Sequence, residues 1–278
     1  MSLQKQLRRW RRRWVYKNPL SLLNLESGVR IKEVKRAQSP VLVERGRDDS
    51  TLVIAFTGAN RLLLMPVYEF FETTKTMGCS RILLCDQYRQ HYERGIDERR
   101  PDFPSLIAYL KQEIARLGPK IILCIGTSAG GYAAIRAGHQ LRADYVHAFG
   151  AQTGDPPPGS SRRGRPEKAP PDLAQILKHS NEKTIYYLHY CRDCGDDRYH
   201  AERLFKSPGV AALGYHCAAH DVATFLGKKG FLTEFLAIAN QDRLVELAKA
   251  HFGDSVHINR PPSKKRSAPQ HLDHFLPH

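Results

Sequence analysis

Short apolar runs alternate along this chain with segments in which apolar residues recur at helical spacing. The apolar runs are typical of buried β-strands, and most of them are followed by a helical pattern. The runs occupy 51–56, 81–85, 120–126, 143–150, 184–191 and 209–217, and the helical patterns occupy 65–78, 103–118, 130–138, 197–205 and 221–240. Strands that alternate with helices form crossover units, so we predict an α/β fold with a doubly wound, mostly parallel sheet and helices on both faces.

The alternating pattern fills the middle of the chain, and 278 residues can bury a core of this kind within one domain. Two earlier segments, 29–35 and 41–45, have strand patterns, and we expect them to pair antiparallel before the alternation begins. The stretch 154–171 is rich in Pro, Gly, Ser and Arg, which predicts a long loop. We therefore expect three parts, namely a basic N-terminal segment at 1–28, a domain at 29–253 and a basic, disordered tail at 254–278.

One junction between a predicted strand and a predicted helix carries a lone serine between glycines. The sequence KIILCIGTSAGGYAAIRAG, residues 120–138, places Ser128 at the centre of a Gly-x-Ser-x-Gly motif. A strand, this motif and a helix in succession are typical of a nucleophile elbow, in which a tight turn presents the serine hydroxyl. The amide groups at the start of the helix favour negative charge beside it. The alternative is a glycine-rich turn in which Ser128 caps the helix.

A serine nucleophile needs a general base and an acidic group that orients the base. In the order serine, acid, histidine, the acid follows a later strand and the histidine follows the last one. His220 follows the last predicted strand and precedes a helical pattern, so we prefer it to His216 at the end of that strand. For the acid we prefer Asp197, with Asp196 next and Asp193 as a further candidate. Each of these aspartates has the alternative role of a helix N-cap.

An acyl transfer also needs donors for the oxyanion that forms at the attacked carbonyl. We expect one from the backbone N–H of Ala129, the residue after the serine, and one from the loop after an earlier strand. The loop after the first apolar run reads TGAN, and Gly58 allows the tight turn that would direct the amide of Ala59 to the site. Thr57 and Asn60 are candidates for side-chain contacts with substrate, with turn residues as the alternative.

These motifs together resemble the α/β-hydrolase family over roughly 51–240. The segments FTGAN, LLCD, GTSAGG, DDRYHAERL and HDVATFL follow one another in the order of that family. The resemblance implies an esterase, thioesterase, lipase or peptidase type of acyl transfer, and the fold alone does not choose among them. The chain departs from the commonest pattern because it has FTGAN where many members have His-Gly, and because it lacks a long helical cap domain. The phrases LMPVYEFF, AFGAQT and DRYHAERL also resemble small bacterial hydrolases linked to cell-surface polysaccharide.

We therefore predict a serine hydrolase that cleaves an ester or thioester through an acyl-enzyme, with Ser128 as nucleophile, His220 as base and Asp197 as the orienting acid. This chemistry needs no cofactor and no metal. The narrower hypothesis for the substrate is an envelope- or polysaccharide-related ester. The alternative from another class is a non-catalytic binding protein that keeps the hydrolase fold and uses its basic segments to hold a polyanion or an anionic membrane.

The six cysteines do not suggest a disulfide scaffold in a chain of this length. Cys85 and Cys124 lie in apolar runs, where a reduced cysteine behaves as a small hydrophobic residue. Cys191 and Cys194 form a C-x-x-C pair that would need two further ligands, with Cys217 as a candidate, to hold zinc. A redox pair is also disfavoured, because its first cysteine should begin a helix whereas Cys191 ends a predicted strand.

The formal net charge of +15 is concentrated in a few basic segments. Leu3, Leu7, Trp10 and Trp14 would share one face of a helix among arginines, as in an interfacial helix on an anionic membrane. Solvated, partly disordered basic segments are the simpler interpretation. A mitochondrial transit peptide has a similar composition. Nucleic acid is the least favoured partner, because no recognised nucleic-acid module accompanies the charge.

The expected compartment follows from the length of the apolar runs and from the composition of the first residues. No run of about 20 apolar residues occurs, and the first residues lack the apolar region of a secretory signal. We therefore expect a cytoplasmic protein whose contact with a membrane, if it has one, is made by the N-terminal segment.

Overall fold

The computed structural model describes the part of the chain that carries most of the predicted strands. The described residues are 40–59, 63, 77–157, 169–179, 183–217, 220, 222–229, 231, 234, 241–253 and 256–259. The arginine-rich start, the expected strand at 29–35, most of the expected helix at 65–78, Asn60 and the chain after 259 lie outside them. The predictions made for those segments, including the membrane contact, stay predictions.

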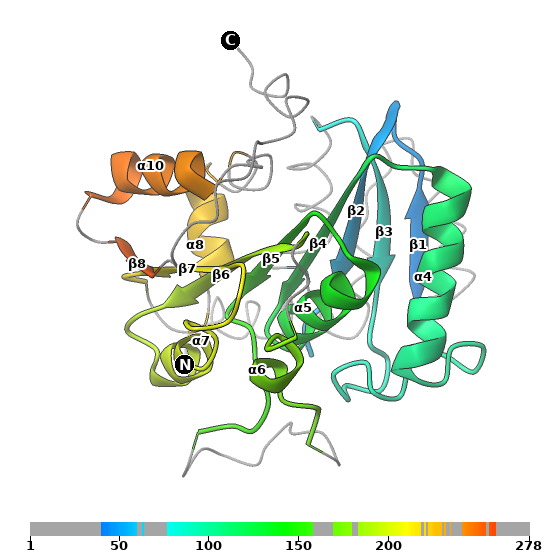
Figure 1. Ribbon diagram of the computed structural model, residues 1–278, viewed down its shortest axis with the longest axis horizontal. Helices are drawn as coiled ribbons and strands as arrows, with labels where there is room; N and C mark the ends of the chain where they lie inside the picture. The colour runs from blue at the N-terminus through cyan, green and yellow to red at the C-terminus, as the bar shows by residue number, and fades with distance from the viewer. Residues whose placement is uncertain are drawn as a thin grey trace, which may run out of the picture.

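Within the described residues, eight strands form one open sheet in the order β1-β3-β2-β4-β5-β6-β7-β8 (Figure 1). The six strands from β3 to β7 in this order pair parallel, while β1 and β8 pair antiparallel at the two edges. The strands are β1 (Val41–Glu44), β2 (Asp48–Phe56), β3 (Cys79–Leu84), β4 (Ile121–Thr127), β5 (Tyr145–Phe149), β6 (Ile185–Cys191), β7 (Val210–Tyr215) and β8 (Val256–Asn259). The predicted α/β fold with a mostly parallel sheet is confirmed.

Helices cover both faces of this sheet and form two cores. The described helices are α4 (Phe103–Leu117), α5 (Ala129–Leu141), α6 (Leu173–Ile176), α7 (Gly195–Glu202), α8 (Val222–Lys228) and α10 (Gln241–Phe252). Successive side chains of a strand point to opposite faces, so Leu52 packs with residues of α4 and α5, whereas its neighbour Val53 packs with residues of α8 and α10. Burial of both faces explains why the strands read as continuous apolar runs. No helix in the described part of the chain is both long and apolar enough to cross a membrane.

The register of the parallel strands brings their carboxyl ends to one edge of the sheet. Phe56 of β2 is aligned with Gly126 of β4, Thr127 with Phe149 of β5, and Phe149 with His189 of β6. The loops that follow these strands therefore start side by side. In open α/β sheets, this edge is where ligands bind.

Two details differ from the expected organisation. The strand β1 is antiparallel, as expected, but its partner in the described sheet is β3. The strand β8 pairs with β7 and carries the sheet to Asn259, beyond the expected domain end at 253. The polar, basic composition of this segment predicts a disordered tail. A four-residue edge strand can satisfy its backbone hydrogen bonds without an apolar run, so composition alone does not reveal it.

Candidate active site

Ser128 occupies a tight turn between β4 and α5. β4 ends at Thr127 and α5 begins at Ala129, so Ser128 alone makes the change of direction, with φ 52° and ψ −119°. L-residues rarely adopt such a conformation, and backbone strain of this kind is concentrated at functional sites. The Ser128 side chain makes no capping hydrogen bond to α5, so the alternative of a simple helix cap is wrong.

Two glycines allow this turn because three segments of backbone meet there. A Cβ atom at Gly126 would lie 2.0 Å from the carbonyl oxygen of Gly130. A Cβ atom at Gly130 would lie 2.2 Å from the carbonyl oxygen of Phe56 at the end of β2. Both distances are far below a van der Waals contact. The motif therefore needs glycine at both positions, and the close packing holds the end of β2 against the turn.

Asp197 and His220, the preferred acid and base, are joined by a hydrogen bond between Oδ1 and Nδ1. Asp197 lies in the first turn of α7 with a side chain that is 2% exposed, whereas the His220 side chain is 45% exposed. The second carboxylate oxygen, Oδ2, accepts a hydrogen bond from the backbone N–H of Cys191 at 3.3 Å. Because a carboxylate only accepts, Nδ1 of the imidazole must donate, which leaves Nε2 as the proton acceptor of the neutral ring.

The loop after β5 connects this pair with the serine turn. The backbone N–H of Ser128 donates to the carbonyl of Phe149, the last residue of β5, at 2.9 Å. The next residue, Gly150, has φ 51°, and a Cβ atom there would lie 2.9 Å from Cε1 of His220 and 3.3 Å from Oδ2 of Asp197. All three candidate residues thus adjoin two successive residues, Phe149 and Gly150, at the end of β5. The hydrogen bond expected between Ser128 Oγ and His220 stays a prediction, and such bonds often tighten only when substrate is bound.

The expected oxyanion donors flank the same turn. Ala129 is the first residue of α5, where backbone N–H groups have no partner within the helix. On the other side, a Cβ atom at Gly58 would lie 3.7 Å from Cβ of Ser128, so the loop residue that precedes Ala59 lies near the serine. Thr57 is 1% exposed and its hydroxyl lies 3.4 Å from Oη of Tyr92, so the structure gives it an interior role rather than a substrate contact.

The less favoured acid and base, Asp193 and His216, form a hydrogen-bonded pair of their own at a different place. His216 Nδ1 lies 2.9 Å from Oδ1 of Asp193, and its Nε2 lies 3.2 Å from Nη1 of Arg192. The side chains of His216 and Asp193 are 51% and 52% exposed. Asp196 is also exposed on the surface of α7. The structure therefore separates the preferred pair, which adjoins Gly150, from a solvent-facing pair.

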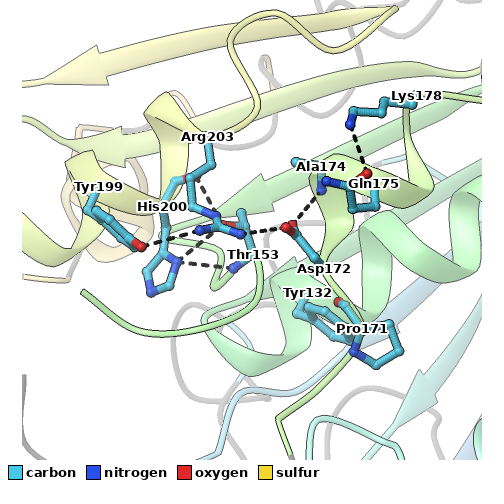
Figure 2. Close-up of polar contacts among 10 residues, drawn as sticks. All are labelled: Tyr132, Thr153, Pro171, Asp172, Ala174, Gln175, Lys178, Tyr199, His200 and Arg203. Atoms are coloured by element: carbon cyan, nitrogen blue, oxygen red, sulfur yellow. Dashed lines mark hydrogen bonds and ion pairs between the residues drawn. The ribbon is translucent and has the colours of Figure 1, made fainter. Parts of the chain in front are cut away.

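A second set of polar contacts, which the sequence analysis missed, fixes α7 against the loop after β5. The backbone N–H of Thr153 donates to Nδ1 of His200 at 3.2 Å, and Arg203 forms a 2.7 Å ion pair with Asp172 (Figure 2). Arg203 also donates from Nη1 to the hydroxyl of Tyr199 at 3.2 Å. Burial lowers the pKa of His200 to about 4, so its ring is neutral at ordinary pH and can accept. No sequence motif marks these residues, because the contacts depend on how α7 docks.

The C-x-x-C pair takes part in packing rather than in a ligand cluster. Cys191 Sγ donates to the carbonyl of Cys217 at 2.6 Å. Burial raises the pKa of the Cys194 and Cys217 thiols, which disfavours the thiolate that metal binding or redox chemistry needs. Among the described residues, no three His, Cys, Asp or Glu side chains are grouped to hold a metal ion.

Comparison with known proteins identifies the fold. No family model and no curated protein matches the chain. A carboxylesterase structure from the thaumarchaeon Nitrososphaera gargenis is 14% identical to this chain. The match covers 73% of this chain and 96% of the carboxylesterase chain, with a TM-score of 0.52. A chain in a structure of the Glycosylation Associate Protein (Gap123) complex from Streptococcus agalactiae is 15% identical to this chain. The match covers 77% of this chain and 44% of that chain, with a TM-score of 0.51.

At such low identities the likeness concerns the fold. The strand order, the parallel registers and the turn between β4 and α5 are those of the α/β-hydrolase fold. The resemblance to α/β-hydrolases that the sequence motifs indicate is thereby confirmed at the level of the fold.

Proposed function

We propose that this protein is a serine hydrolase that cleaves an ester or thioester through an acyl-enzyme. The observation that carries the proposal is that Ser128, His220 and Asp197 all adjoin the two residues at the point where β5 ends. Phe149 holds the backbone of Ser128, and Gly150 adjoins the hydrogen-bonded pair of His220 and Asp197. A serine in a strained turn beside an oriented imidazole is the arrangement that nucleophilic catalysis requires.

Each residue has a defined part in the proposed reaction. Ser128 Oγ attacks the substrate carbonyl while Nε2 of His220 takes the hydroxyl proton, which it then gives to the leaving alcohol or thiol. Asp197 holds the imidazole in the tautomer with hydrogen on Nδ1. The amides of Ala129 and Ala59 would donate to the oxyanion, and each such donor contributes about 3 kcal/mol to the transition state. Water, activated by the same imidazole, then releases the acyl group.

The backbone strain and the buried carboxylate of this site disfavour the non-catalytic alternative. A binding protein that only kept the fold would have no need to hold Ser128 at φ 52° or to bury the Asp197 carboxylate. Burial of a carboxylate is unfavourable unless hydrogen bonds compensate, and here both oxygens accept one. The envelope- or polysaccharide-related substrate rests on sequence phrases alone, and it remains our proposal for the ester's origin.

Labelling with a fluorophosphonate tests the nucleophile without knowledge of the substrate. In this reaction the Oγ–P bond forms, the P–F bond breaks, fluoride leaves and His220 accepts the hydroxyl proton. We expect the full-length protein to be labelled on Ser128 and Ser128→Ala to be unlabelled at unchanged melting temperature. Ser105→Ala, which changes a half-buried serine in the first turn of α4, should be labelled like wild type. A folded wild-type protein that resists the probe would contradict the proposal and favour the binding role.

A further inference from the structure

The loop of residues 150–153 adjoins Ser128, Asp197 and His220, so its position affects how these three groups are aligned. Gly150 adjoins His220 and Asp197, as described above. Two residues later, the backbone N–H of Gln152 donates to the carbonyl of Ser128 at 3.3 Å. A displacement of this short segment would therefore move the serine turn relative to the imidazole. The question is what holds the segment in place.

One side of the loop is held by His91. Its Nε2 is hydrogen-bonded to Oε1 of Gln152, and its ring packs edge-to-face on Tyr132 of α5 at a centroid distance of 5.6 Å. His91 is 5% exposed, and burial lowers its pKa, so the ring is neutral. The amide oxygen of Gln152 accepts, so Nε2 of His91 carries the hydrogen. The other nitrogen, Nδ1, is buried and has no hydrogen-bond partner among the described residues.

The backbone that presents His91 is unusual. Asp86, in the loop that follows β3, accepts hydrogen bonds from the backbone N–H groups of Tyr88, Arg89, Gln90 and Tyr92. Within this loop, three non-glycine residues, Arg89, His91 and Tyr92, have φ values of 56–64°. Such conformations persist only where the surroundings determine them, and they cluster at functional sites.

The neighbour of His91 fixes the opposite side of the serine turn. The hydroxyl of Tyr92 lies 3.0 Å from the carbonyl oxygens of Thr57 and Leu84. Thr57 precedes Gly58 and Ala59, the segment that would supply the second oxyanion donor. Two successive left-handed residues thus direct one side chain to the loop after β5 and the other to the loop after β2.

The other side of the 150–153 loop is held by His200. Its Nδ1 accepts from the backbone N–H of Thr153, and the hydroxyl of Thr153 lies 3.2 Å from the His200 carbonyl oxygen (Figure 2). His200 is 5% exposed and lies three residues after Asp197 in α7. The same contact therefore joins the loop to the helix that carries the candidate acid.

We propose that His91 and His200 are positioning residues that hold the 150–153 loop from two sides and so align Ser128 with the pair of Asp197 and His220. Neither imidazole contacts the reacting atoms. His91 acts as a donor to Gln152, and His200 acts as an acceptor from Thr153, a role that requires a neutral ring. The inference rests on the proposed serine hydrolase function, because it assigns the supports of that site.

The test measures the second-order rate constant for fluorophosphonate labelling of Ser128 in the full-length protein, together with the melting temperature of each variant. His91→Phe keeps a ring against Tyr132 but removes the donor, and Gln152→Leu removes its acceptor. His200→Phe removes the acceptor for Thr153. We expect each change to slow labelling by about tenfold to a hundredfold, because small misplacements of catalytic groups have effects of this size.

Matched variants separate positioning from general destabilisation. His139 lies in the last turn of α5 and its Nδ1 is 2.9 Å from the hydroxyl of Tyr186, so it is a histidine with a comparable contact at the end of α5 away from Ser128. We expect His139→Phe to lower the melting temperature without changing the labelling rate. Gln152→Glu keeps an acceptor oxygen for His91 and should retain most of the rate that Gln152→Leu loses. Because His91 and Gln152 act as a unit, the double variant of His91→Phe and Gln152→Leu should be no slower than either single variant.

The outcomes distinguish this inference from the function on which it rests. If wild type is not labelled on Ser128, the proposed function fails. If wild type is labelled and the His91 and His200 variants react at the wild-type rate, the proposed function stands and the positioning role is overturned. Equal slowing of His139→Phe would also overturn it, because the rates would then follow stability alone.

Discussion

The described part of the chain contains two histidine–aspartate pairs that are almost equivalent in sequence. Asp193 and Asp197 are four residues apart, and so are their partners His216 and His220. Both pairs use Nδ1 of the histidine and one carboxylate oxygen. They differ in burial, since both side chains of the first pair are about half exposed, whereas the Asp197 side chain is 2% exposed.

The difference shows that formation of a pair does not by itself mark a catalytic group. Water competes with the exposed pair, and such pairs contribute little to stability. In the buried pair, the Cys191 amide binds the second oxygen of Asp197 and Gly150 lies against both side chains. The buried carboxylate can therefore fix one orientation of the imidazole, whereas the exposed one can be replaced by solvent.

The largest expected contrast comes from removal of each carboxylate charge. Asp197→Asn should leave the fold intact and reduce turnover of an ester by about 10⁴-fold, because the amide no longer enforces the tautomer with hydrogen on Nδ1. Asp193→Asn and Asp196→Asn should leave turnover unchanged. Steady-state hydrolysis of a soluble chromogenic ester checks all three. A severe defect in Asp196→Asn with a mild one in Asp197→Asn would reverse the assignment of the acid.

A smaller effect is expected when the buried pair is displaced rather than removed. Gly150→Ala adds a Cβ atom 2.9 Å from Cε1 of His220, so the imidazole must shift, and activity should fall by about 10²-fold. Gly118→Ala is the matched control, since Gly118 has φ 64° but a Cβ atom there would meet nothing within 4 Å. Both variants bear the backbone strain, and only Gly150→Ala should lose activity in the same ester assay. Equal activity in the two would contradict the placement of the ring.

The smallest effect belongs to the exposed pair. We expect Asp193→Ala and His216→Ala each to change the free energy of unfolding by less than about 0.5 kcal/mol, the range of surface ion pairs. Urea denaturation followed by circular dichroism measures this, and a double-mutant cycle gives the coupling between the two side chains. A coupling free energy of several kcal/mol would contradict this prediction, because the pair would then be strong despite its exposure to solvent.

Much of the fold could be predicted because it depends on local pattern. The apolar runs marked the strands from β2 to β7, and the Gly-x-Ser-x-Gly motif marked the turn at Ser128, since the glycines there are required by backbone contacts. The order of the motifs also gave a preferred acid and base. The choice between Asp196 and Asp197 could only be provisional, because adjacent residues of a helix differ by about 100° in direction and the docking of α7 decides which one is buried.

The remaining features depend on tertiary contacts that leave no periodic signal. His91 reaches Gln152 only because Asp86 holds a loop that contains left-handed residues. The residue types in this loop do not predict that conformation. His200 meets Thr153 across 47 positions of the chain. The short strand β8 falls in a polar segment, and only its pairing with β7 defines it.

The antiparallel edge strands have a consequence for how this protein behaves in solution. A parallel sheet that ended at β7 would offer a row of unpaired N–H and C=O groups to the strands of other molecules. β8 pairs with Ala212 to Tyr215 of β7, and β1 covers β3 in the same way at the opposite edge. A shortened version that stops before Val256 would therefore uncover the strand that leads into the His220 segment, and we expect it to aggregate through that edge even though every proposed catalytic residue is still present.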